Sequence, residues 1–236
     1  MTEKNSPRLL TIDLDDTLWP CAPTIHRAEA RLYSWLERTA PRLTEAHDPD
    51  SLRRQRRDLM QVRPEIAHDL TAVRRDSLRE LLAAFGYEED LADDAMALFL
   101  DHRNRVEPYS DVIPALRGLA VQYRLVSITN GNSDVTRTPL RGLFHHSLTA
   151  AGVGAARPDP ALFLGALEWA RIPSDQALHV GDDPRLDVEA ARRVGMATVW
   201  VNRDGNSWPQ ELAPPDAEVA DLIELDRWLK GCAHAL

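Results

Sequence analysis

Residues 9–18 read LLTIDLDDTL, and this stretch decides the fold of the 236-residue chain. Leu9–Asp13 is a short apolar segment, typical of a strand, and it ends in carboxylates. Asp13 and Asp15 can approach the same ligand, because side chains two positions apart share one face of a strand. Two carboxylates this close require a cation or a shared proton. The stretch therefore predicts a strand that leads into a charged site.

The chain after Pro108 alternates strand-like and helical segments. Further strands are predicted at Arg124–Thr129, Ala177–Gly181 and Ala197–Asn202. Asp159-Pro160 resembles an N-cap followed by a first-turn proline, which opens a helix to about Ala170. Residues 188–194 are helical, with Gly195 as the stop. This alternation predicts an α/β fold with a parallel, helix-covered sheet, which places its ligands at the carboxyl ends of the strands.

The segment between the first two predicted strands has no convincing strand of its own. Its apolar residues recur at helical spacing, with Pro41 and Pro64 as breaks. They predict four helices, at roughly 24–40, 50–62, 66–85 and 90–105. The expected organisation is therefore a core domain of residues 1–21 and 106–236, with an all-helical domain of residues 22–105 inserted into it.

Polar residues of complementary chemistry follow the predicted strands. Thr129 and Asn130 are neutral groups that can hydrogen-bond the oxygens of an anion. The strand 177–181 is followed by hard oxygen ligands of the type that Mg²⁺ prefers, namely Asp182, Asp183 and Asp187. Arg157, in a proline-rich turn, adds a fixed positive charge. With Asp13 and Asp15, this set suits a Mg²⁺-assisted attack on a phosphate.

Each of these motifs is common in isolation. An Asp or Asn at a strand end is most often part of a turn, and Arg157 alone could be a surface charge. All four motifs nevertheless occur in one order at the ends of predicted elements, which favours a functional site.

The joint pattern of motifs resembles the haloacid dehalogenase-like (HAD) hydrolase superfamily. The matching segments are 13–18, Thr129-Asn130, 157–160 and 181–187. The resemblance implies a Rossmann-like core, with the helical insert as a C1-type cap domain. Residues 13–20 and 179–191 look most similar to a bacterial FMN-phosphatase-like branch. The function it implies is Mg²⁺-dependent hydrolysis of a small phosphorylated metabolite, with FMN as one suggestion.

The resemblance also implies a role for each matching residue. Asp13 would be the nucleophile that takes the phosphoryl group, and Asp15 would protonate the leaving oxygen and then activate water. Thr129 and the Asn130 backbone would hold the phosphoryl oxygens. Asp182 would bind Mg²⁺ together with Asp13 and the Asp15 carbonyl. Asp183 and Asp187 would complete the acidic shell directly or through water, in an order that the sequence leaves open.

The third motif departs from the family pattern, because Arg157 stands where the family has a lysine. Arginine keeps the charge and can bind phosphate through two nitrogens, although its geometry differs from that of an ammonium group. We therefore expect Arg157 to bind phosphate and to orient the nucleophile.

Other functions remain possible on the same scaffold. One is 2-haloacid dehalogenation, which needs no Mg²⁺; the carboxylate of Asp15 argues against it, because dehalogenases of the superfamily lack an acid there. Another is a catalytically silent binding or regulatory protein, which the complete set of aspartates disfavours.

Composition limits the partners. The net formal charge is −9, so a general nucleic-acid partner is not expected. No apolar run approaches a membrane span, and residues 1–8 do not lead into a secretory signal. The expectation is a cytoplasmic enzyme, monomeric or homodimeric, that acts on a small-molecule phosphate ester.

Three further features have ordinary structural explanations. The arginines of residues 53–57 could attract phosphate, but a solvated helix face is the simpler interpretation. Trp19 could stack on a flat substrate ring, but a hinge or core anchor is expected. His179 lies inside a predicted strand and is expected to be a packed core histidine rather than a base.

Overall fold

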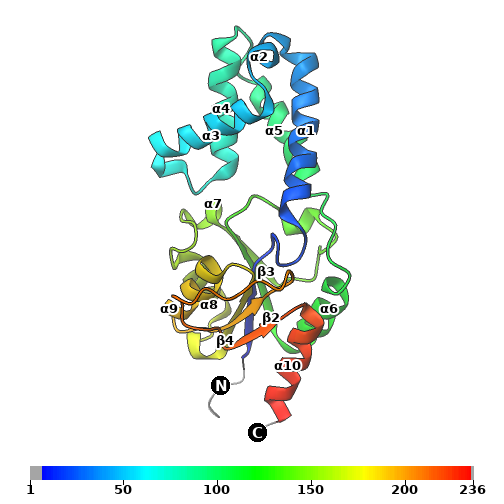
Figure 1. The fold of residues 1–236 in the computed structure, drawn as a ribbon, viewed down its shortest axis with the longest axis vertical. Coiled ribbons are helices and arrows are strands. Elements are labelled where there is room, and N and C mark those ends of the chain that lie inside the picture. Colours follow the sequence, from blue (N-terminus) through cyan, green and yellow to red (C-terminus); the bar gives the residue numbers. More distant parts are fainter. Residues whose placement is uncertain (1–6, 235–236) are drawn as a thin grey trace. The chain divides into compact units, whose positions relative to one another are not determined.

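The computed structural model describes residues 7–234, so residues 1–6 and 235–236 of the expected core domain lie outside it. The chain forms two compact units (Figure 1). Within the described residues, the first consists of residues 7–20, 107–130 and 135–234, and the second of residues 21–106 and 131–134. No helix within residues 7–234 is long and apolar enough to cross a membrane.

The first unit is built on a six-stranded sheet in which every neighbouring pair is parallel. In chain order the strands are β1 (Leu9–Ile12), β2 (Arg124–Thr129), β3 (His146–Thr149), β4 (Ala177–Gly181), β5 (Ala197–Val201) and β6 (Ala217–Val219). Their order in the sheet is β3-β2-β1-β4-β5-β6. The predicted α/β fold is therefore confirmed.

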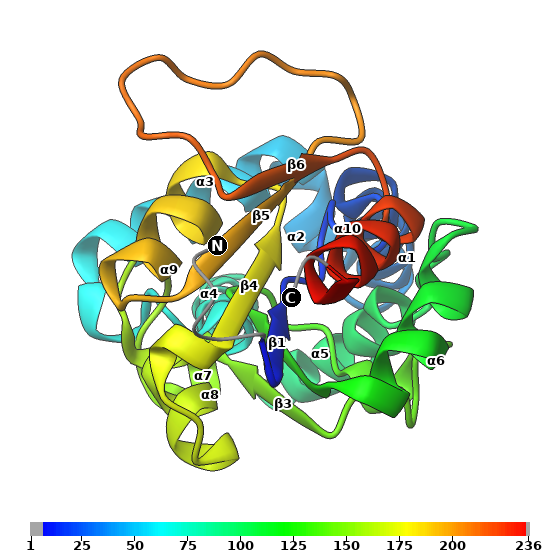
Figure 2. The ribbon, with the colours of Figure 1, turned by 90° about the horizontal axis from the view of Figure 1, so that it is seen from below.

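Helices cover both faces of this sheet. Figure 2 shows α8 (Ala161–Ala170) and α9 (Ala190–Arg193) on one face, and α6 (Val112–Gln122) and α10 (Leu222–His234) on the other. A short helix, α7 (Ala150–Val153), follows β3 directly. This cover on both faces explains why β1, β2, β4 and β5 read as short, mostly buried apolar runs rather than as an alternating pattern.

Strand β1 lies at the centre of the sheet, and its four residues are all buried. It pairs with β2 on one side and β4 on the other, so the direction in which the chain adds strands reverses at β1. Parallel sheets bind their ligands outside the carboxyl ends of the strands at such a reversal. This geometry places Asp13 and Asp182, which follow β1 and β4, at one edge of the sheet.

Two predicted helix starts are corrected by the structure. The residue before α8 is Pro160 rather than Asp159, whose side chain instead accepts a hydrogen bond from the Ala161 amide at 2.9 Å. The helix expected from Val188 begins earlier, with a π-helical turn over Pro184–Glu189 that continues into α9. Its wide winding arises because the Val188 amide donates to the Asp183 carbonyl, five residues back, at 3.3 Å.

The second unit is all-helical, as the insert was expected to be. Its helices are α1 (Cys21–Thr39), α2 (Pro41–Ala46), α3 (Pro49–Val62), α4 (Leu70–Ala84) and α5 (Leu91–Arg103). The short α2 was not predicted, and the helix expected from residue 66 begins only at Leu70. Asp69 causes that later start, because its carboxylate accepts hydrogen bonds from the first amides of α4. Ala28, Leu36, Leu82 and Phe99 are among the fully buried residues of its core.

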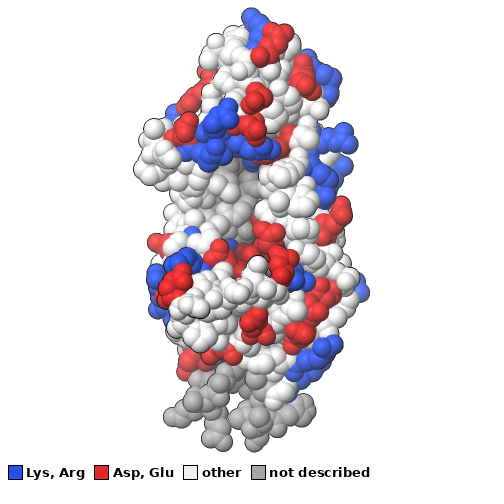
Figure 3. All heavy atoms as spheres, viewed as in Figure 1, with Lys and Arg blue, Asp and Glu red and all other residues white. Residues whose placement is uncertain are grey.

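A single buried carboxylate ties three helices of the second unit together. Glu29 on α1 accepts hydrogen bonds from Arg53 at 2.7 Å, Arg56 at 2.5 Å and Arg74 at 2.9 Å. Burial works against the charge of Glu29, but the guanidinium of Arg56 and the hydrogen bond from Arg53 lower its pKa below the usual value. Figure 3 shows basic side chains gathered over α3. Arg54 and Arg57 are exposed, as the solvated-face interpretation predicts, whereas Arg53 and Arg56 are partly buried and contact Glu29.

Candidate active site

The turn after β1 holds the first carboxylates in a fixed arrangement. The Asp13 amide donates to the Val180 carbonyl of β4 at 2.9 Å. Asp16 adopts a left-handed conformation with φ of 60°, and its amide donates to the Trp19 carbonyl at 2.8 Å. The indole Nε1 of Trp19 donates to Asp15 Oδ1 at 2.8 Å. Trp19 is completely buried, so it anchors the turn and is not available to stack on a substrate.

Arg157 is buried and contacts two carboxylates. Its Nη2 donates to Asp13 Oδ1, and its Nη1 donates to Asp187 Oδ1. Asn130 holds the backbone of the arginine on both sides, because its side chain accepts from the Arg157 amide at 2.8 Å and donates to the Arg157 carbonyl at 3.0 Å. Thr129 is buried at the end of β2. The side chain of Asn130 therefore positions the cation of the site.

The residues after β4 complete an acidic cluster. Asp13, Asp182 and Asp187 each offer one carboxylate oxygen, and these oxygens lie within 4.8 Å of one another. Thr17 donates its hydroxyl to Asp182 Oδ1 at 2.7 Å. The carboxylate of Asp183 is used differently, since it caps the following helical turn through the amides of residues 185 and 186 at 2.7 and 2.8 Å. The structure thus brings Asp187, rather than Asp183, into the cluster.

Asp187 is fixed by several donors and by a close backbone approach. Its Oδ1 accepts from His179 Nε2 at 3.1 Å as well as from Arg157, and its Oδ2 accepts from the Asp183 amide at 2.9 Å. A Cβ atom added to Gly181 would lie 2.6 Å from the Asp187 Cβ, so only glycine leaves room for this side chain.

The electrostatics of the cluster show an excess of negative charge. Burial, with the neighbouring carboxylates of Asp187 and Asp182, raises the pKa of Asp13 well above its usual 3.8, although Arg157 opposes the shift. Burial and the charge of Asp187 also raise the pKa of Asp182 to about 7. Asp187 is the exception, because Arg157 and His179 outweigh its burial and hold its pKa below the usual range. Three carboxylates and one guanidinium therefore fit an additional cation with hard oxygen ligands, such as Mg²⁺.

Not every expected site residue reaches the cluster through its side chain. Asp13, Arg157, Asp182 and Asp187 lie together, whereas Asp15 is held by Trp19 and Asp183 caps a helical turn. Sequence reasoning missed Thr17 and Gly181, although both lie inside the matched motifs. His179 is a buried core histidine as predicted, but its contact with Asp187 was not foreseen. Burial lowers the pKa of His179, which favours the neutral ring.

A clasp around Arg203 supports the turn after β1. Arg203 donates from Nε to the Thr17 carbonyl at 2.9 Å and from its two terminal nitrogens to Asp111 at 3.1 and 3.0 Å. Its guanidinium lies 3.9 Å from the centre of the Tyr109 ring. Since Thr17 in turn donates to Asp182, the clasp fixes the backbone that carries this contact.

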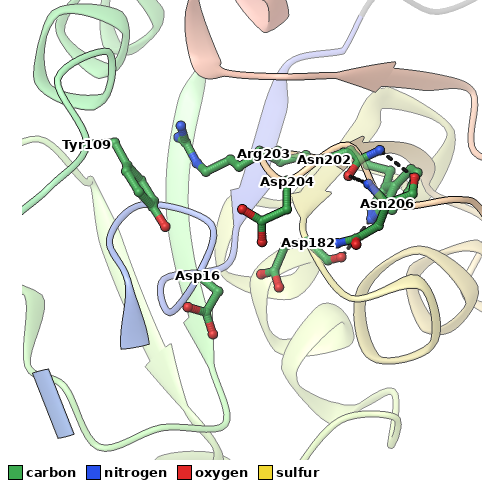
Figure 4. Close-up of a pocket in the computed structure, with 9 residues that line it drawn as sticks. Asp16, Tyr109, Asp182, Asn202, Arg203, Asp204 and Asn206 are labelled. Atoms are coloured by element: carbon green, nitrogen blue, oxygen red, sulfur yellow. Dashed lines mark hydrogen bonds between the residues drawn. The ribbon is translucent and has the colours of Figure 1, made fainter. Parts of the chain in front are cut away.

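A small cavity lies beside the clasp (Figure 4). Its lining includes Asp16, Tyr109, Asp182, Arg203 and Asp204. Its volume is about 90 Å³, well below the roughly 300 Å³ at which small-molecule pockets begin. The cavity can hold water next to Asp182 but not a metabolite.

Comparison with known proteins identifies the family of the chain. The family model described as haloacid dehalogenase-like hydrolase matches residues 7–195. A relative from Escherichia coli (strain K12), the 5-amino-6-(5-phospho-D-ribitylamino)uracil phosphatase YigB, is 32% identical over 92% of this chain and 93% of its own.

Two solved structures extend the comparison. One, named as a 2-haloacid dehalogenase from Pseudomonas syringae pv. Tomato DC3000, has a TM-score of 0.90 at 39% identity and covers 95% of this chain and 99% of its own. A HAD phosphatase from Thermococcus onnurineus has a TM-score of 0.67 at 26% identity, covering 95% and 98% of the two chains. The chain therefore belongs to the haloacid dehalogenase-like hydrolases, as the resemblance of its motifs indicated.

Proposed function

We propose that the chain is a Mg²⁺-dependent phosphatase that hydrolyses a small phosphorylated metabolite through an aspartyl-phosphate at Asp13. The family membership and a relative named as a phosphatase over nearly the whole chain support phosphoric monoester hydrolysis. The observation that carries the proposal is the buried cluster in which Asp13 meets Arg157 and two further carboxylates. In this proposal residues 1–21 and 106–236 form the catalytic core and residues 22–105 the cap domain.

The cluster provides groups for binding both a cation and a phosphate. Asp13, Asp182 and Asp187 would hold Mg²⁺ with the Asp15 carbonyl, and Asp183 would contribute through water. Bound there, Mg²⁺ would neutralise the negative charge of the carboxylates and of the phosphoryl oxygens. Arg157, Thr129 and the Asn130 backbone would bind the remaining phosphoryl oxygens.

In this proposal the reaction proceeds in two successive displacements at phosphorus. In the first, an Asp13 oxygen attacks phosphorus, the bond to the ester oxygen breaks, and protonated Asp15 gives that oxygen its proton. In the second, Asp15 takes a proton from water, whose oxygen attacks phosphorus and releases inorganic phosphate and Asp13. The indole of Trp19 holds the Asp15 carboxylate by a hydrogen bond at 2.8 Å, two positions along the chain from the nucleophile.

The name of the Escherichia coli relative suggests a substrate class. That protein acts, by its name, on a uracil derivative with a phosphorylated ribityl chain. FMN also carries a phosphorylated ribityl chain on a heterocycle. We therefore propose ribityl phosphates of flavins and related rings as the first substrates to test.

A second candidate, 2-haloacid dehalogenation, is favoured by the name of the Pseudomonas syringae structure at 39% identity. The two reactions differ in their need for a proton donor, since a halide leaves without protonation and an alkoxide does not. Asp15 supplies a carboxyl group that can give and take this proton, and the Trp19 indole holds that group by a hydrogen bond at 2.8 Å. We therefore rank the phosphatase first.

A substrate screen tests the proposal. Purified protein is assayed for phosphate release from a panel of phosphorylated metabolites that includes FMN, with Mg²⁺ or with EDTA, and for halide release from 2-chloropropionate. We expect phosphate release that requires Mg²⁺ and that is absent in Asp13→Asn. Halide release in EDTA would establish the dehalogenase instead, and tight binding without turnover across the panel would indicate a silent binding protein.

A further inference from the structure

A buried chain of contacts leads from the middle of the sheet to Asp13. Thr11 Oγ1 lies 2.9 Å from His179 Nδ1, and His179 Nε2 lies 3.1 Å from Asp187 Oδ1. Asp187 binds Arg157, which binds Asp13. Thr11 and His179 are direct partners in the register of β1 and β4, so the two backbones set their separation. His179 is completely buried and is absent from the proposed reaction steps.

Hydrogen-bond chemistry assigns the proton of this histidine. A carboxylate can only accept, so the contact with Asp187 requires a hydrogen on His179 Nε2. In the neutral ring the other nitrogen, Nδ1, then accepts, and the Thr11 hydroxyl is its donor. The ring of Phe163 packs against the imidazole in a T-shaped contact, with ring centroids 5.0 Å apart at 84°. The ring thus has fixed neighbours on three sides.

We infer that His179 is a positioning residue: its Nε2–H, with Nδ1 accepting from the Thr11 hydroxyl, fixes the Asp187 carboxylate and through it the Arg157 guanidinium at Asp13. Oδ1 of Asp187 receives two donors, Arg157 Nη1 and His179 Nε2. Removal of the histidine donor leaves that oxygen with the arginine alone, so that among the described residues the Asp183 amide on the other oxygen becomes the only further hydrogen bond that sets the tilt of the carboxylate. The role given to Arg157 rests on the proposed function. The tautomer of His179 follows from its hydrogen bonds and does not depend on that function.

Nitrogen NMR of the full-length protein tests the tautomer. The chain has eight histidines, so the ¹⁵N imidazole signals of His179 are assigned by their loss in His179→Gln. We expect a neutral ring with hydrogen on Nε2, in the absence and in the presence of Mg²⁺. Thr11→Ser, which retains the hydroxyl, should leave both nitrogen signals in place. Thr11→Val should keep the hydrogen on Nε2, which Asp187 requires, but should shift the Nδ1 signal, because that nitrogen loses its donor. An Nδ1–H tautomer or an imidazolium in the unsubstituted protein would overturn the inference.

Matched histidine variants test the positioning. The amide nitrogen of Gln can take the place of Nε2, whereas that of Asn takes the place of Nδ1. We expect His179→Asn to lower kcat about 10- to 100-fold with KM changed less than twofold, as for loss of an outer-shell partner. His179→Gln should retain at least a fifth of kcat. Equal losses in the two variants, or wild-type kcat in His179→Asn, would overturn the positioning role.

Two controls separate the possible failures. Melting temperatures of both variants show whether a fall in kcat reflects unfolding, and comparison is made only at temperatures where both are folded. If the unsubstituted protein releases phosphate from no member of the panel, the proposed function fails. The NMR experiment then still decides whether the contact with Asp187 fixes the tautomer of His179.

Discussion

Arg157 donates a hydrogen bond to Asp13, although 144 positions separate the two residues in the chain. The other terminal nitrogen of the same guanidinium donates to Asp187, so one planar group spans two buried carboxylates. Lysine, the residue that the family typically has at this position, presents a single nitrogen. The geometry at Asp13 thus depends on the fork of an arginine in this chain.

Arg157→Lys should therefore be impaired, even though it restores the residue typical of the family. One ammonium nitrogen cannot occupy both positions of the fork, and a charged hydrogen bond is worth about 1.5–3 kcal/mol. We expect kcat/KM to fall roughly tenfold or more, and Arg157→Met to fall further. Steady-state kinetics on the best substrate checks this, and an Arg157→Lys enzyme as active as the unsubstituted one would show that the fork is dispensable.

Gly181→Ala should disrupt the site from within β4. The added Cβ would overlap the Asp187 side chain, and overpacking of this kind costs about 1–3 kcal/mol. We expect a lower free energy of unfolding in urea. We also expect the activity to fall under conditions in which the variant is still folded. Gly118→Ala on α6 is the matched control, because no atom lies within 4 Å of its added Cβ. That control should be neutral or slightly stabilising, and a neutral Gly181→Ala would contradict the structure.

Stability without metal should depend on pH through Asp182. Its pKa is raised from 3.8 to about 7 in the folded protein, so the folded state binds more protons than the unfolded state between these values. The stability that this group contributes is complete below pH 4 and is lost as the pH rises through 7. Other groups titrate in the same range, so Asp182→Asn is the comparison. In EDTA, we expect the unsubstituted protein to lose unfolding free energy relative to the variant as the pH is raised from 4.5 to 7.5.

Mg²⁺ provides the control for this pH dependence. A bound cation favours the ionised carboxylates, so Mg²⁺ should stabilise the unsubstituted protein more at pH 7.5 than at pH 5. The same addition should have little effect on Asp182→Asn. If the unfolding free energies of the two proteins in EDTA changed in parallel with pH, the pKa of Asp182 would not be raised in the folded protein.

Glu29→Gln should destabilise the second unit strongly. Removal of this buried charge leaves three guanidinium groups around a neutral amide, and breaking a buried ion pair typically costs about 3–5 kcal/mol. Asp93→Asn is the control in the same unit, since its pair with Arg79 is largely exposed and should be worth less than about 1 kcal/mol. Urea unfolding followed by circular dichroism compares the two variants, and equal effects would refute the buried role of Glu29.

The sequence predicted the centre of the sheet better than its edges. The strands β1, β2, β4 and β5 are apolar runs that end in polar turns, and such runs are visible without a structure. The edge strands β3 and β6 were missed, because β3 is the half-buried segment HSLT and β6 has only three residues. Both form by pairing with a neighbour, which local sequence does not show.

The site shows the same division between local and distant information. Asp13, Arg157 and Asp182 belong to motifs and could be predicted one by one. Their supporting contacts could not, because the bond between Thr11 and His179 depends on the register of β1 against β4. The clasp of Arg203 and Asp111 likewise joins segments 92 positions apart.

Oxygen-18 tracking in a single turnover tests the central claim most directly. The enzyme, in excess over FMN or over the best substrate of the screen, reacts in H₂¹⁸O with Mg²⁺. Mass spectrometry then measures the ¹⁸O content of the released phosphate and of the peptide that contains Asp13. Water that attacks phosphorus leaves its oxygen in phosphate, so we expect labelled inorganic phosphate and an unlabelled Asp13. Label in Asp13 after reaction with a 2-haloacid, with no phosphate released from any ester, would contradict the account.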